Sequence, residues 1–179
     1  MADSAQSLSL SDRRLVAEWA AACADRVLWL FETVCPDDDR PRTAIVRAQA
    51  FAAGELAAAA GIRQRFGGGG IAAKSPAATA AARAAGQASA VCHMGTHALG
   101  AAAYAILAVK MEVPDRPEAA EDEMDWQRAQ MSADVLAALR KLPLVGTDRS
   151  GPLGPGLLAT GEVGAIIRQL QDMIAASEV

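Results

Sequence analysis

The sequence predicts a single all-α domain, a bundle of about five helices around one long apolar central helix. Of the residues, 52% are apolar but only 4% are aromatic, and alanine supplies the difference, as in closely packed helices. Residues 84–109 contain no Lys, Arg, Asp or Glu, which predicts a helix buried on all sides. The segments around it repeat apolar residues at helical spacing. A chain of 179 residues is long enough to bury one such core.

Charge and cysteine content narrow the function classes. The net charge is −4, which argues against a nucleic-acid-binding protein because such proteins carry a basic stripe. The chain opens without a basic stretch followed by an apolar one, so we expect a cytoplasmic protein rather than a secreted one. Its three cysteines follow no metal-binding spacing, and we expect small buried thiols in a reducing compartment.

The central segment, residues 84–109, is long enough to span a membrane, which takes about 20 apolar residues. Polar side chains interrupt it, however, and the sequence has no second candidate span. We therefore expect the core helix of a bundle and no membrane partner. A helix over residues 76–111 would be longer than its neighbours, so we expect an overhang, a kink or a break between residues 83 and 87. Gly95 or Gly100 would also bend easily.

The elements before the central segment begin with residues 1–8, which are small and polar and are expected to be disordered. Ser9 with Asp12 resembles a capping box, and it opens a helix that Pro36 ends. An acidic run precedes the proline that begins residues 41–60. Acidic residues before a first-turn proline are typical of a helix start, so this range is the second predicted helix.

The remaining elements are a loop, a helix, a linker and a terminal helix. Residues 62–74 include four consecutive glycines and are expected to form a flexible loop, because a phosphate-binding loop needs Lys and Ser or Thr directly after its glycines. Residues 118–142 form a further amphipathic helix, which completes a bundle domain over 9–142. Residues 143–160 are rich in Gly and Pro and are expected to form a linker or, alternatively, an extended wrap around the bundle. Residues 161–179 form an amphipathic helix that docks on the bundle or, alternatively, joins two copies as a homodimer.

The central segment holds both histidines, spaced four residues apart, and the one tyrosine. A catalytic zinc usually takes three protein ligands, and there is no third histidine, so no metal or other cofactor is expected. The imidazoles could instead be core groups bonded to the first two helices, because an unsatisfied buried nitrogen costs about 1–3 kcal/mol. They could also line a ligand pocket or a partner contact, with arginines that precede the second helix. The candidate polar inlay or ligand pocket comprises His93, His97, Tyr104, Asp39, Arg40 and Arg42.

A second candidate site is the acidic stretch at the start of the helix over 118–142. It could be a solvated face that complements the helix dipole, or it could be a surface for a partner. On either interpretation its side chains are exposed, so reversing the charges of Glu121 and Glu123 should leave the melting temperature nearly unchanged. The candidate partner surface comprises Glu118, Glu121, Asp122, Glu123 and Asp125.

The sequence contains no arrangement that indicates catalysis. Cys92 would point about 100° away from His93 on a helix, which makes it a poor third metal ligand. No strand with a nucleophile elbow is predicted and no Ser or Cys is placed beside a histidine, so nothing indicates nucleophilic catalysis. The Glu-x-x-His pairs of di-iron bundles are missing as well. We therefore predict no catalytic residues and a non-enzymatic protein.

Three blocks of the chain resemble the Imm-5-like putative immunity proteins, which are small alanine-rich helical proteins of bacteria. They are residues 19–28 with 31–32 and 38–42, residues 81–87 with His93 and 97–105, and Trp126-Gln127-Arg128. The blocks follow the family's order and together cover roughly residues 10–142; the four-glycine loop and everything after residue 143 lie outside them.

The resemblance implies a protein that neutralises a toxin by binding it, with no catalytic residues to carry over. An acidic chain suits a basic protein toxin, because complementary charge speeds association and sets specificity. The alternative is a helical bundle that binds a small ligand or a metal through His93, His97 and Tyr104. An enzyme of a kind that these residues do not indicate is a third hypothesis.

Overall fold

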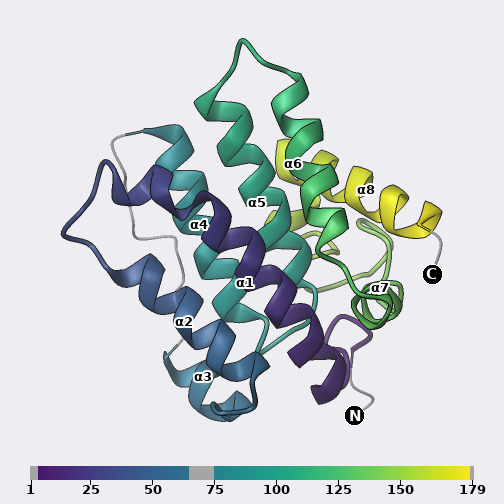
Figure 1. The fold of residues 1–179 in the computed structure, drawn as a ribbon. Coiled ribbons are helices and arrows are strands. Elements are labelled where there is room, and N and C mark those ends of the chain that lie inside the picture. The colour runs from purple at the N-terminus through teal and green to yellow at the C-terminus, as the bar shows by residue number, and fades with distance from the viewer. Residues whose placement is uncertain (1–3, 65–74, 178–179) are drawn as a thin grey trace.

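The computed structural model describes residues 4–64 and 75–177, and the elements in this part of the chain are all helical (Figure 1). The all-α fold class is confirmed, although the described part holds eight α-helices and one short 3-10 helix rather than about five. They are α1 (Leu10–Glu32), α2 (Arg40–Ala52), α3 (Ala58–Gln64), α4 (Pro76–Ala90), α5 (His97–Glu112), α6 (Glu118–Ala129), α7 (Ala133–Leu139), η1 (Leu157–Ala159) and α8 (Gly161–Ala176). The four-glycine loop predicted from the sequence lies outside the described residues.

Helices α1, α4 and α5 pack against one another at the centre of the molecule (Figure 1). Alanine occupies most of the buried positions of α4 and many of those of α5. Because small side chains at a contact let helix axes approach closely, the three helices form one alanine-rich core. Helix α2 covers α1 and α4, whereas α6 and α8 cover α5. No helix in the described ranges is both long and apolar enough to cross a membrane.

The expected continuous central helix is two helices, and this prediction is wrong. Residues 91–96 form a connector, and α4 and α5 lie side by side as a helical hairpin (Figure 1). The break therefore falls after the expected range, residues 83–87. Gly95 lies in the connector, and a side chain there would meet the Leu8 side chain at 2.5 Å. The backbone N–H groups of Gly95 and Thr96 donate to carbonyls of Ser7 and Gln6, so the N-terminal residues hold this turn.

Residues 4–8 and 143–160, expected as a disordered end and a linker, pack together in the structure. The Gln6 side chain is buried, and its Nε2 donates to Asp148 Oδ2 at 2.7 Å and to the Ser150 carbonyl at 2.6 Å. Its Oε1 accepts from the Leu153 N–H at 3.1 Å. Leu153 is itself fully buried. Residues 143–160 therefore lie against the bundle as the extended wrap would, and one amide and a few leucines make both segments part of the core.

The C-terminal helix α8 packs against α5. Its apolar side is covered by the chain itself, at Val163, Ile166, Ile167, Leu170 and Ile174. Arg140 after α7 donates to the Ile174 carbonyl from Nε and Nη2, at 3.2 and 3.1 Å, and to the Ser177 carbonyl. These contacts hold the end of α8 against α7.

Candidate functional site

The two histidines do not share a helix face. His93 lies in the connector and is exposed, whereas His97 begins α5 and is half-buried. His97 Nδ1 is 2.7 Å from Gln87 Oε1 of α4, so the expected bond to the first or second helix is instead a bond to α4. A side chain at Gly100 would meet that Gln87 oxygen at 2.5 Å. Gly100 therefore leaves room for the amide, and His97 links the two halves of the helical hairpin.

The other members of the candidate inlay have partners of their own. Tyr104 is buried, with the Arg83 guanidinium 5.8 Å from its ring centroid. Arg42 bridges two carboxylates of α1, with Nη1 2.6 Å from Asp25 and Nε 2.9 Å from Glu32. The hydrogen bond to Glu32 is the main cause that raises the pKa of Arg42.

Asp39 and Arg40 lie at the exposed start of α2. Arg40 pairs with Asp38 at 2.6 Å and holds the pKa of that carboxyl below its ordinary value. The Asp39 side chain makes no capping hydrogen bond to α2. Arg40 and Arg42 thus pair with carboxylates at the surface around α2, whereas His97 and Tyr104 contact groups of α4.

Four of the five candidate partner-surface residues form one exposed side of α6. Glu118, Glu121, Asp122 and Asp125 are exposed, and their spacing of three, four and seven residues places them on one helix face. Glu118 pairs with Arg116 at 3.2 Å, and a backbone hydrogen bond is the main cause that lowers its pKa. The other three carboxylates have no hydrogen bond or ion pair with any described residue. We call these four residues the acidic face.

Glu123 is not part of that face, and its assignment as an exposed residue is wrong. It is 3% exposed, and its carboxylate accepts from Arg26 Nε at 2.7 Å and from Gln127 Nε2 at 3.1 Å. Gln127 Nε2 also donates to the Ala102 carbonyl of α5. Trp19 of α1 donates from Nε1 to the Gln127 carbonyl at 2.9 Å. The inward side of α6 is thus tied to both α1 and α5 by a buried polar network.

A signal for this network was present in the sequence. The spacing of four residues between Ala119, Glu123 and Gln127 is typical of the inward stripe of a helix. Because acidic residues surround Glu123 in the sequence, it was grouped with them as an exposed residue. The network also affects Cys23 of α1: burial, with a further contribution from the charge of Glu123, raises the pKa of that thiol well above its ordinary value.

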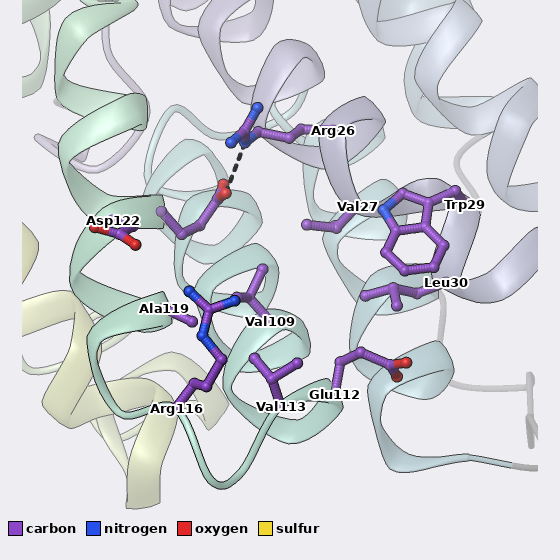
Figure 2. A pocket seen from close by; sticks show the side chains of 11 residues that line it. Arg26, Val27, Trp29, Leu30, Val109, Glu112, Val113, Arg116, Ala119 and Asp122 are labelled. Carbon is purple, nitrogen blue, oxygen red and sulfur yellow. Dashed lines mark hydrogen bonds and ion pairs between the residues drawn. The ribbon is translucent and has the colours of Figure 1, made fainter.

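A groove of about 500 Å³ lies between α1, the end of α5 and the start of α6. Figure 2 shows α1 side chains on one wall, α6 side chains on the other, and Val109 and Val113 between them. Its apolar lining consists of Val27, Leu30, Val109, Val113 and Ala119. We call this feature the α1–α6 groove. Sequence reasoning missed it because two segments far apart in the chain, residues 26–30 and 109–123, build it.

The rim of the α1–α6 groove carries charges and one aromatic side chain. Trp29 of α1 is 56% exposed, an unusual position for a tryptophan, since most of its surface is normally buried. Both cations of the rim are paired within the chain, Arg26 with Glu123 and Arg116 with Glu118. The rim carboxylates of Glu112 and Asp122 have no such partner among the described residues. The groove therefore has a surplus of unpaired negative charge.

The surface of the described residues offers features that can bind a partner protein. Within residues 4–64 and 75–177 no group of three or more His, Cys, Asp and Glu side chains could hold a metal ion. What the surface does offer is the acidic face and, beside it, an apolar groove with an exposed tryptophan. Asp122 belongs to both features.

Comparison with known proteins gives one match. A family model described as Imm-5 like putative immunity protein matches residues 6–134. These residues include α1 to α6 and thus both walls of the α1–α6 groove. No curated protein and no solved structure matches the chain.

Proposed function

Because the chain belongs to the Imm-5 like putative immunity protein family, we propose that it neutralises a basic protein toxin by binding it, without catalysing a reaction. The acidic face of α6 carries this proposal. Three of its four carboxylates, those of Glu121, Asp122 and Asp125, are exposed and unpaired among the described residues. They are part of a chain whose net charge is −4.

Unpaired surface carboxylates in a row attract a cationic partner before contact and select its orientation. The buried network beneath the acidic face supports the same role. Trp19, Glu123 and Gln127 fix α6 to the bundle, so the carboxylates keep their positions when a partner arrives. A rigid surface loses little conformational freedom on binding, and this favours affinity.

The binding takes place in the cytoplasm and involves a toxin rather than a second copy of this chain. The cysteines support the location: Cys23 and Cys92 are buried as thiols and no disulfide joins the three described cysteines, as is usual in reducing compartments. The apolar side of α8 is covered within the chain, which leaves little of it for a homodimer. The alternative of a ligand or metal seam has less support, since His93 is exposed, His97 is bonded to Gln87 and Tyr104 is buried.

The test starts by capturing partners from the native cell on the tagged chain and identifying them by mass spectrometry. A captured basic protein is then expressed alone and together with this chain, and host growth is followed. We expect growth to stop in the first case and to recover in the second. A captured partner that is harmless when expressed alone would overturn the toxin proposal.

The role of the acidic face is tested by stopped-flow association with the purified partner. The double variant Glu121→Lys/Asp125→Lys should associate about tenfold or more slowly at low salt, with a difference that shrinks as salt rises. The matched control is Glu18→Lys/Asp172→Lys, which makes the same change of net charge at exposed positions on α1 and α8. Equal association rates for the two double variants would refute the acidic face as the binding surface.

A further inference from the structure

The α1–α6 groove adjoins the acidic face, and the charges on the rim of the groove indicate the charge of the group that it binds. Its two rim cations are already paired with carboxylates of the chain, at 2.7 Å for Arg26 and 3.2 Å for Arg116. Glu112 and Asp122 have no partner within the described residues. An occupant that neutralises the surplus must therefore bring positive charge.

The interior of the groove is apolar, so the charge of the occupant must lie beside an apolar group. Val27 and Leu30 are almost fully buried beneath the opening, and Trp29 stands exposed at its edge. Figure 2 shows Trp29 and Leu30 on the α1 wall, with Val109 and Val113 at the end of α5. A large apolar side chain seated here would cover Trp29 and gain about 25 cal/mol for each Å² of apolar surface removed from water.

We propose that the α1–α6 groove is the anchoring pocket for the toxin and receives one large apolar side chain that lies next to a Lys or Arg. This inference rests on the proposed function and specifies the partner's contact segment. Trp29 covers the apolar side chain, and Glu112 accepts from the neighbouring cation.

Arg26 supports this role through its orientation. Its Nε is bonded to Glu123 and its guanidinium lies 4.2 Å from the centroid of the Trp126 ring, so the group is fixed at the rim before binding. Tryptophan and arginine are the residue types that most often dominate binding energy at protein interfaces. Asp122 joins the groove to the acidic face, so one partner can contact both at once.

The test can be carried out before the toxin is identified. Random seven-residue peptides displayed on phage are selected on the immobilised full-length chain, and the consensus peptide is synthesised. We expect a large aromatic or aliphatic residue next to Lys or Arg. Titration should then show a Kd raised about thirtyfold by Trp29→Ala, the loss typical of a dominant interface residue. Glu112→Gln should raise the Kd by a smaller factor, and only for peptides that carry the cation.

The matched control is Val46→Ala, which removes a side chain of nearly equal exposure from α2, 53% against 56% for Trp29. It should leave the Kd unchanged, and circular dichroism should show that all variants are folded. No enriched peptide, an acidic consensus, or equal binding by Trp29→Ala and Val46→Ala would each overturn the groove assignment.

A second arm separates this inference from the proposed function. With the purified toxin, Trp29→Ala should speed dissociation, whereas the acidic-face variant should slow association, because buried anchors act on dissociation and exposed charges on encounter. Toxin binding that is indifferent to Trp29→Ala would refute the groove and leave the proposed function standing. Peptide selection without any toxin partner would refute the function instead.

Discussion

Two glutamates of α6, two positions apart, should lose very different amounts of stability on the same substitution to lysine. Glu121 is exposed, with no partner among the described residues, whereas Glu123 is 3% exposed and accepts from Arg26 at 2.7 Å. Removing one partner of a fully buried ion pair costs about 3–5 kcal/mol. The Arg26 side chain is 42% exposed, so water screens part of the loss, and we expect about 2–4 kcal/mol for Glu123→Lys.

That cost converts to a measurable change in melting temperature. For a chain of this size each kcal/mol shifts the transition by about 2–4 °C, so Glu123→Lys should melt roughly 4–16 °C below the wild type. Glu121→Lys changes an exposed side chain and should stay within about 0.5 kcal/mol of it. Glu123→Gln keeps an acceptor for Arg26 and for Gln127, and should lose about 1 kcal/mol.

The assay is urea denaturation followed by circular dichroism, with thermal melts of the same variants. Both reversals change the net charge by the same amount, so Glu121→Lys controls for electrostatic effects on the whole molecule. A Glu123→Lys protein that unfolds at the same urea concentration as Glu121→Lys would refute the buried network. It would also mean that Glu123 is exposed and belongs to the acidic face.

Three further outcomes are expected. In the native chain a thiol reagent should label the half-buried Cys35 far faster than the two buried cysteines, and all three should react in denaturant; equal native rates would contradict this burial. His97→Ala should lower the free energy of unfolding in urea by about 1 kcal/mol because Gln87 loses its partner, and His97→Gln should recover part of the loss. An unchanged free energy of unfolding would show that the bond between His97 and Gln87 does not stabilise the fold. The Gln6 side chain donates a hydrogen bond to Asp148, and this bond lowers the pKa of the Asp148 carboxyl below its ordinary value of 3.8. The bond therefore contributes to the stability of the fold above pH 3.8, and this contribution is lost as the pH falls through the lowered pKa. In an NMR titration, Gln6→Ala should show a raised pKa for Asp148, and the variant should no longer lose this part of its stability in acid. An unchanged pKa would contradict the contact between Gln6 and Asp148.

The fold class could be predicted from composition, but the path of the chain could not. A segment that is apolar on every face is buried whether it continues as one helix or turns back as two, so the pattern of residues 84–109 is the same in both cases. Gly95 marked a place where the chain could turn. The residues that stabilise the turn, Ser7 and Gln6, lie about ninety positions away in the chain, where no local pattern links them to it.

For the candidate sites too, local sequence pattern predicts some features, and contacts between distant segments decide the others. The acidic face follows from helical spacing once α6 is predicted, and four of the five residues lie on it. The burial of Glu123 depends on Arg26 of α1 coming within 2.7 Å, which local spacing does not encode. The α1–α6 groove depends on the same approach of α1 to α6. The sequence therefore carried a signal for the inward stripe of α6, but not for the ion pair with Arg26 or for the groove.

The contact that hides Glu123 is also what makes a binding surface of α6. Had Glu123 remained in water, α6 would carry charges on most of its circumference and would have little reason to stay against the bundle. With Glu123, Gln127 and Ala119 turned inward, the remaining carboxylates gather on one side, and α6 becomes a wall of the groove. Arg26 is then held between Glu123 and Trp126, at the rim where a partner would meet it. Stability and binding therefore depend on one network, so a substitution within it changes both and cannot test binding alone. Substitutions of Trp29, Glu112 and the acidic face can test binding alone, because these residues lie outside the network.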